Sequence, residues 1–146
     1  HETGHLLTMM IFGVKIKKLI FSGFGICIET EKSGIVPVCR SIGVLLSGPA
    51  ANFLMYFLLR VSGVHTQTEV LSLFMGIYNL LPYQQLDGGA VLELLITGSV
   101  YERELRILLK IVRLGIIIFS AVLTALGGFG YIPLFAAAVL LYYNEA

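Results

Sequence analysis

Long runs of apolar residues without charges dominate the pattern along this chain. Between Arg40 and Arg60, residues 41–59 contain no charged residue. A helix needs about 20 predominantly apolar residues to cross the hydrocarbon core of a bilayer, so this run is long enough to span it. We therefore expect a transmembrane helix here.

Further apolar runs flank this segment. Residues 1–14 predict the second half of a spanning helix that ends at Lys15. Residues 70–81 and 90–96 form another run, which Pro82 interrupts. A helix broken at membrane depth is tolerated only where it is buried in protein or lines a cavity, so this interruption points to a polar site.

Two more apolar runs lie near the carboxyl end. One follows the charged stretch 101–113 and ends at Leu126, and the other covers residues 129–143. We therefore expect residues 1–146 to be one domain, an all-α polytopic membrane protein with about five transmembrane segments. Since the first helix is already under way at His1, we also expect an amino-terminal membrane segment that is missing from this sequence.

A region of different pattern separates the first two apolar runs. Lys15–Lys17 and Phe24–Glu29 show partial alternation of apolar and polar residues, which predicts short strands in a small membrane-associated β element. An edge strand of this kind could hold an unwound substrate segment by strand addition. A simple cytoplasmic loop explains the pattern equally well.

Composition and charge narrow the class of protein. The chain is 57% hydrophobic and 13% charged, with a mean hydropathy of +0.89, whereas soluble domains are about a quarter charged. A net charge of +1 gives no reason to expect a nucleic-acid partner. The two cysteines, Cys27 and Cys39, have no metal-knuckle spacing and fit plain structural thiols.

The basic residues predict an orientation in the bilayer. Nine of the ten Lys and Arg residues lie in segments 15–40 and 98–113, which fall on the same side if each apolar run crosses once. The positive-inside rule places that side, and the carboxyl terminus, in the cytoplasm. We therefore expect an integral protein of a bacterial cell membrane with its site opening toward the cytoplasm.

The first five residues form an HExxH motif. Positions i and i+4 share one face of a helix, so His1 and His5 can bind a single zinc ion. Glu2 lies beside them and can take a proton from a zinc-bound water, whose pKa the metal lowers toward about 7. Ionisable residues in an apolar helix are costly, which favours a functional role over a chance match.

A catalytic zinc site needs a third protein ligand. His65 lies in a polar loop on the opposite side of the expected membrane, and Glu29 and Glu31 lie in a charged loop, so solvation explains all three. Asp87, the only Asp in the chain, follows the broken helix. Helix rise places His5 and Asp87 at similar depths, roughly 15 Å from the cytoplasmic border, which favours Asp87.

Three motifs in order resemble the site-2 protease family of intramembrane zinc metalloproteases. They are HExxH at residues 1–5, a GPxxN pattern at residues 48–52, and NxxP followed by LDG within residues 79–89. The resemblance implies one Zn²⁺ held by His1, His5 and Asp87, with Glu2 as general base. Ala90 departs from the basic residue expected after LDGG.

The remaining motif residues have less specific roles. Asn52 and Asn79 are expected to line the site and hold the substrate backbone or the developing oxyanion, while interhelical hydrogen bonding is the plainer alternative. Structural roles near the site are expected for a set of small or helix-breaking residues: Gly48, Pro49, Pro82, Gly88 and Gly89.

The sequence thus predicts an endopeptidase that cuts within or beside a transmembrane segment of a membrane-tethered regulatory protein. No PDZ-like insert fits between Leu59 and Val70, which indicates the compact subgroup of the family. That subgroup includes a sporulation protease, so a sigma-factor precursor or an anti-sigma factor is a candidate partner. A membrane zinc transporter and a metal-binding scaffold without protease activity are the alternatives.

Overall fold

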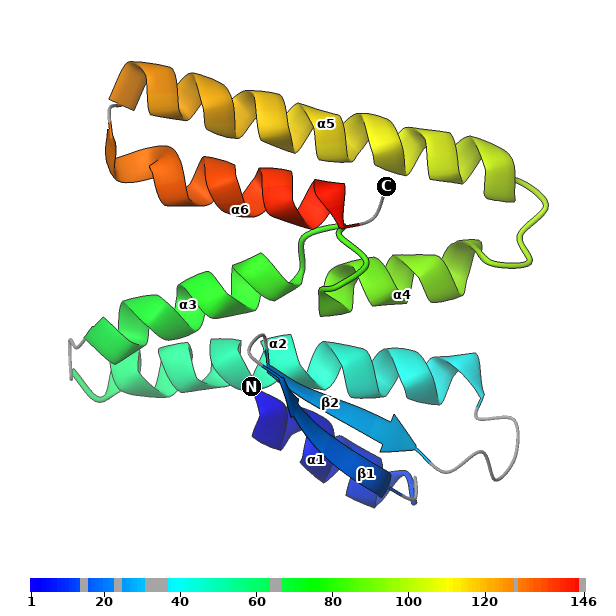
Figure 1. Cartoon of the computed structure of the whole chain (residues 1–146). Helices are drawn as coiled ribbons and strands as arrows, with labels where there is room; N and C mark the ends of the chain where they lie inside the picture. Colours follow the sequence, from blue (N-terminus) through cyan, green and yellow to red (C-terminus); the bar gives the residue numbers. More distant parts are fainter. Residues whose placement is uncertain (14–15, 23–24, 31–36, 64–66, 128, 145–146) are drawn as a thin grey trace. The chain divides into compact units, whose positions relative to one another are not determined.

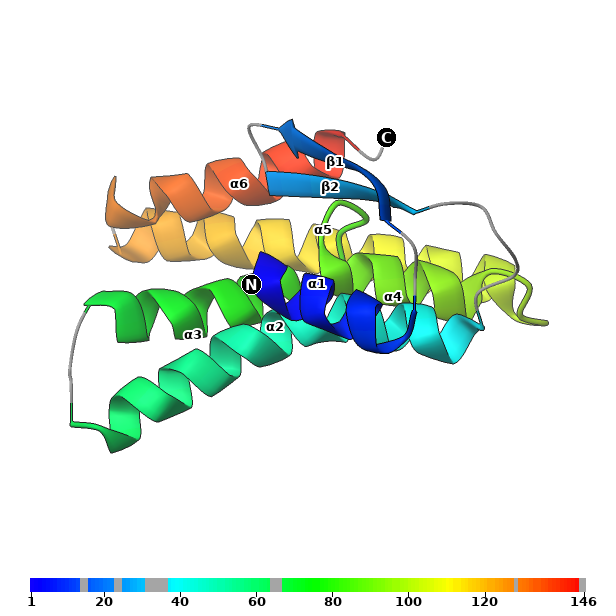
Figure 2. The ribbon, with the colours of Figure 1, turned by 90° about the horizontal axis from the view of Figure 1, so that it is seen from below.

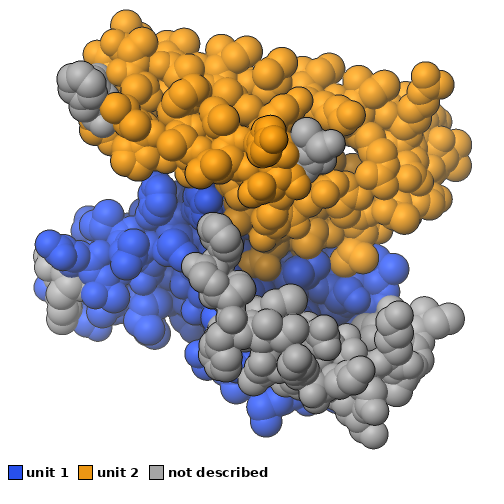
Figure 3. Space-filling model, viewed as in Figure 1, with its two compact units in different colours: residues 1–80 blue, residues 81–146 orange. Residues whose placement is uncertain are grey.

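The computed structural model describes residues 1–13, 16–22, 25–30, 37–63, 67–127 and 129–144. The chain divides into two compact units, His1–Leu80 and Leu81–Ala146 (Figure 3). His65 and Glu31, two of the alternative ligands weighed above, lie outside the described residues.

The first unit is built on one long helix. Its elements are α1 (Glu2–Ile11), β1 (Ile16–Ser22), β2 (Gly25–Thr30), α2 (Val38–Val61) and α3 (Gln67–Asn79) (Figure 1). Both α1 and α3 pack against α2, and α1 lies alongside it in both ribbon views (Figures 1 and 2). α2 contains the uncharged run 41–59, as the sequence predicts.

Small residues let α1 and α3 approach α2 closely. A Cβ atom on Gly4 would stand 2.9 Å from the Cβ atom of Ala51, and one on Gly76 would stand 2.9 Å from the ring of Phe53. Both distances are shorter than a carbon contact allows, so a side chain at Gly4 would push α1 away from α2, and one at Gly76 would displace the ring of Phe53. In membranes, where lipid tails are as apolar as the helix surfaces, helices usually pack by approaching closely through small residues.

Two antiparallel strands connect α1 and α2. Ser22 pairs with Gly25, and Ile20 pairs with Cys27, while the register shifts between Ile16 and Lys18. The strands lie in the region where the sequence shows partial alternation.

The second unit contains α4 (Asp87–Ile96), α5 (Glu102–Gly127), a 3₁₀ turn (Phe129–Tyr131) and α6 (Ile132–Tyr143). α6 returns along α5 after the turn, and α4 packs on the opening part of α5 (Figure 1). Arg106 ties these two helices together, with its guanidinium 2.9 Å from Glu93 and 2.9 Å from Glu102.

The charged stretch 101–113 is helical almost throughout, since α5 begins at Glu102. The apolar run expected after this charged stretch is therefore the continuation of a helix that already includes it. Acidic residues in the first turn suit the positive end of the helix dipole, and Glu102 pairs with Arg106 one turn later. The change from charged to apolar residues after Arg113 therefore does not coincide with the start of α5, which begins at Glu102.

The described helices form a membrane-type fold, but the expected count of about five spans is not supported. Among the described residues, α2 and α5 are the helices long and apolar enough to cross a bilayer. Both expose large apolar side chains, such as Phe57 and Phe119. The interruption at Pro82 leaves α3 and α4 with 13 and 10 residues, and α6 has 12, all shorter than a full crossing.

Candidate metal centre

The HExxH motif begins α1. His1 is the residue before the first helical turn, Glu2 is the first helical residue, and His5 follows one turn later. His5 is buried at 7% exposure, and both His1 and Glu2 are partly buried. The helix ends near Gly13, whose positive φ of 65° suits a residue without a side chain.

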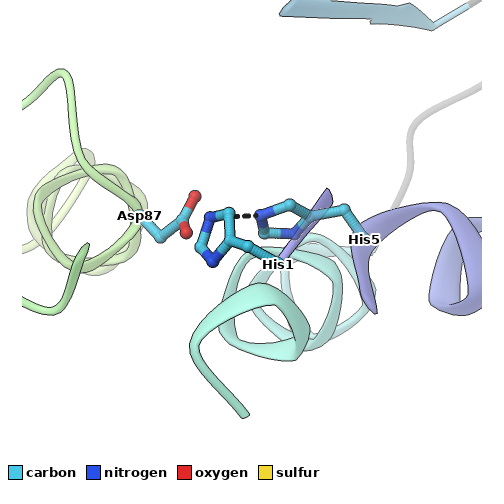
Figure 4. A group of neighbouring side chains, drawn as sticks. All are labelled: His1, His5 and Asp87. Atoms are coloured by element: carbon cyan, nitrogen blue, oxygen red, sulfur yellow. Dashed lines mark hydrogen bonds between the residues drawn. The ribbon is translucent and has the colours of Figure 1, made fainter. Parts of the chain in front are cut away.

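The two imidazoles meet through the nitrogen atoms that a metal would use. Their Nε2 atoms lie 3.3 Å apart, and the ring planes are perpendicular with centroids 4.8 Å apart (Figure 4). Two nitrogen ligands about 2.0–2.1 Å from one tetrahedral zinc ion lie about 3.3–3.4 Å from each other. The observed separation therefore fits a pair of ligands to one zinc ion.

A backbone carbonyl of α2 sets the orientation of His5. Its Nδ1 atom lies 2.8 Å from the carbonyl oxygen of Val44. A carbonyl oxygen only accepts, so Nδ1 carries the proton and Nε2 keeps its lone pair. This is the usual arrangement around histidines that bind metals, in which an outer acceptor fixes both the tautomer and the ring orientation.

Gly48 makes the room in which the histidines sit. A Cβ atom at this position would overlap the imidazole of His5 and would stand 2.8 Å from Cε1 of His1. Pro49, next to it, is among the most completely buried residues and removes one N–H from the ladder of α2. Gly48 therefore lies directly against both imidazoles, and its structural role at a metal site stays a prediction.

The two asparagines differ in their surroundings. Asn52 is buried at 8% exposure, and its Nδ2 atom lies 3.2 Å from Nδ1 of His1. Asn79 is partly exposed and donates from Nδ2 to the carbonyl oxygen of Met75 in its own helix, at 3.0 Å. Within the first unit, the structure therefore brings Asn52 to the histidine pair and gives Asn79 a contact at the end of α3.

Asp87, labelled in Figure 4, belongs to the second unit and is the first residue of α4. Leu86 before it is extended, with φ −107° and ψ 155°, and the helix starts at once. A carboxylate in this position is stabilised by the free N–H groups and dipole of the helix N-terminus. The first turn of α4 therefore suits an acidic residue such as Asp87.

The loop before Asp87 is held firmly inside its own unit. Tyr83 is wholly buried, and its hydroxyl donates to the carbonyl oxygen of Arg113 at 3.4 Å. Arg113 in turn donates from Nε to the carbonyl oxygen of Pro82. Gly89 lies against this loop, because a Cβ atom there would overlap the backbone of Tyr83.

Sequence reasoning missed two of these supporting groups. The carbonyl oxygen of Val44 is a backbone atom, and no residue type signals it. The sequence did hint at Arg113, because it is the last charged residue before the apolar part of α5. In the structure it is only 6% exposed. Buried ionisable residues in such helices usually have a specific partner, which in this case is Pro82.

No family model matches the chain. The chain is 32% identical over 119 residues to stage IV sporulation protein FB of Bacillus subtilis, covering 75% of this chain and 41% of that protein. It is 28% identical over 113 residues to a putative zinc metalloprotease of Synechocystis, covering 68% of this chain and 30% of that protein. The chain thus spans less than half the length of either relative.

Proposed function

We propose that this chain, a member of the site-2 protease family, is the core of a zinc-dependent endopeptidase that cuts within or beside a transmembrane segment. The observation that carries the proposal is the pair of imidazoles on α1, with their Nε2 atoms 3.3 Å apart. Helix α2, which packs against the helix that bears this pair, is long and apolar enough to cross a membrane. One relative is named as a putative zinc metalloprotease, which supports the same metal and reaction class.

We assign one zinc ion to three ligands. His1 and His5 offer Nε2 atoms, and the carbonyl of Val44 already holds His5 in the tautomer that leaves Nε2 free to bind. Asp87 is proposed as the third ligand because it is the only Asp in the chain and starts a helix directly after a buried loop. Two imidazoles and a carboxylate form a donor set typical of catalytic zinc, with a fourth position left for water or substrate.

Glu2 is the proposed general base. A bound zinc ion would polarise the scissile carbonyl and lower the pKa of the attacking water. Glu2, next to His1 in the first turn of α1, would accept the proton of that water and pass it to the leaving amine. The apolar surroundings limit competing water and strengthen the electrostatic effect of each charged group.

The proposed substrate is a membrane-tethered regulatory protein. One relative is named as a sporulation protein, and the resemblance of the sequence motifs to a sporulation protease makes a sigma-factor precursor or an anti-sigma factor our candidate. The bacterial source of both relatives supports a bacterial cell membrane. If the broken run 70–96 returns the chain across that membrane, the basic segments 15–40 and 98–113 support a site that opens toward the cytoplasm, where such a product would be released.

Replacing Glu2 with Gln tests the mechanism directly. In the full-length protein reconstituted in liposomes with a membrane-tethered substrate, Glu2→Gln should keep its zinc content and lose about 100-fold or more in cleavage rate. His5→Ala should lose both zinc and cleavage. Undiminished cleavage by Glu2→Gln, or zinc flux across the liposome membrane that this variant leaves intact, would overturn the proposal.

A further inference from the structure

Helix α2 contacts both histidines at the ring nitrogen that faces away from the proposed metal. The Nδ1 atom of His5 lies 2.8 Å from the carbonyl oxygen of Val44, and that of His1 lies 3.2 Å from the side-chain amide of Asn52. Val44 and Asn52 are about two helical turns apart, so one helix supports both rings. Both groups are buried, at 8% exposure each.

The contacts join Asn52, His1, His5 and the Val44 carbonyl in that order, and the amide orientation of Asn52 determines which group donates at each step. As placed, the amide nitrogen Nδ2 of Asn52 faces Nδ1 of His1, and a neutral imidazole that accepts a hydrogen bond there carries its proton on Nε2. The two Nε2 atoms lie 3.3 Å apart, and His5 donates in turn to Val44. In this arrangement the Nε2 atom of His5 is unprotonated and can bind a metal, whereas the Nε2 atom of His1 carries the proton.

Metal binding by both rings requires one change in that chain. A nitrogen that binds a cation cannot also carry a proton, so the His1 proton must move to Nδ1. An N–H at Nδ1 needs an acceptor, and the Nδ2 atom of Asn52 is a donor only. A half-turn of the amide exchanges its nitrogen and oxygen at nearly the same place, so Oδ1 would face His1.

We propose that Asn52 is the positioning residue for His1, accepting a hydrogen bond from Nδ1 through its side-chain oxygen when His1 binds zinc. Its role would parallel that of the Val44 carbonyl toward His5. The inference rests on the proposed zinc site. It is an alternative to the prediction that Asn52 holds the substrate or the oxyanion, and it is supported by the contact of the amide with the His1 ring.

Zinc affinity, which needs no substrate, tests the assignment. The full-length protein in nanodiscs would be titrated with Zn²⁺ against a chelator, and its Co²⁺ form would be followed by visible absorption. Asn52→Leu keeps the side-chain size but has no acceptor, so we expect zinc affinity to fall about 10–100-fold with a changed Co²⁺ spectrum. Asn52→Asp keeps an acceptor and should bind zinc at least as tightly as the wild type.

Thr124→Val is the matched control. It removes a polar side-chain group of similar size whose hydrogen bond goes to the carbonyl oxygen of Ser120 in its own helix, so zinc affinity and the Co²⁺ spectrum should not change. Should Asn52→Leu fail to fold by circular dichroism, Asn52→Ala carries the same expectation.

The outcomes separate the two proposals. A wild-type protein that binds neither Zn²⁺ nor Co²⁺ would overturn the proposed function and this inference with it. A wild type that binds zinc, beside an Asn52→Leu variant of equal affinity and unchanged spectrum, would overturn the positioning role alone. Equal losses in the Leu and Asp variants would also refute it, because Asp retains the acceptor. A substrate-holding role predicts lost cleavage with zinc affinity intact.

Discussion

Arg113 donates a hydrogen bond from its guanidinium to the carbonyl oxygen of Pro82, 31 residues earlier in the chain. The hydroxyl of Tyr83 returns a hydrogen bond to the backbone of Arg113, so the loop and α5 are joined in both directions. Pro82 interrupts the apolar run, and Asp87 begins α4 a few residues later. A buried arginine therefore fixes the loop that leads to the proposed third ligand.

Removing the guanidinium should loosen this loop. Arg113→Leu leaves the Pro82 carbonyl without its charged donor, and hydrogen bonds to charged groups contribute about 1.5–3 kcal/mol. We expect a loss of that size in the free energy of unfolding, measured by denaturant titration in detergent. Arg113→Lys should recover only part of it, since Lys lacks the fixed fork of donors.

The exposed Arg103 supplies the control for this experiment. It lies in the first turns of the same helix, so Arg103→Leu changes the charge by the same amount at an exposed position. Its stability should stay within about 0.5 kcal/mol of the wild type. Equal destabilisation by both variants would show that the loss of positive charge, not the contact with Pro82, is responsible.

A methyl group at position 48 should displace the histidines. The Cβ atom of Gly48→Ala would overlap the ring of His5, and both rings would have to move. Because ligands must be held within about 0.5 Å of their productive geometry, we expect at least a 10-fold loss of zinc affinity. Chelator competition measures it. Gly115→Ala, with open space around its Cβ position in α5, should bind zinc as the wild type does.

Gly89→Ala should disturb the second unit. The added Cβ atom would overlap the carbonyl group of Tyr83 and stand 2.8 Å from the nitrogen of Gln84. These are backbone atoms that cannot rotate away, so overpacking of about 1–3 kcal/mol is expected in the free energy of unfolding. Gly115→Ala again serves as control, and wild-type stability in Gly89→Ala would contradict the close packing of this glycine.

Zinc itself should stabilise the fold. A ligand that binds only the folded state at 100 times its dissociation constant adds about 2.7 kcal/mol. Thermal unfolding should therefore shift upward when zinc is added to chelator-treated protein, and the shift should vanish in His5→Ala, which lacks one of the paired Nε2 atoms. A shift of the same size in His5→Ala would mean that zinc binds elsewhere.

Hydropathy and motif spacing predicted much of the fold. The uncharged run 41–59 became α2, and the interruption at Pro82 separates α3 from α4. HExxH placed His1 and His5 together because the period of a helix is regular. These features depend on local pattern, which a single sequence contains.

Features that depend on tertiary contacts were not predictable in this way. Residues 102–113 look like a charged loop, yet they are helical because their charges pair along and between helices. Asn52 and Asn79 look alike in sequence, and only packing reveals that Asn52 contacts His1 while Asn79 contacts its own helix. The support given to His5 comes from a main-chain oxygen, which any residue at position 44 would supply.

The spacing along α2 has a consequence for how its sequence can vary in length. Val44, Gly48 and Asn52 each lie one turn apart, so a carbonyl, a gap and an amide share one face of the helix. Inserting one apolar residue between Val44 and Asn52 would leave hydropathy and span nearly unchanged, yet it would rotate Asn52 about 100° from His1. The number of residues in this segment is therefore constrained much more tightly than its hydrophobicity.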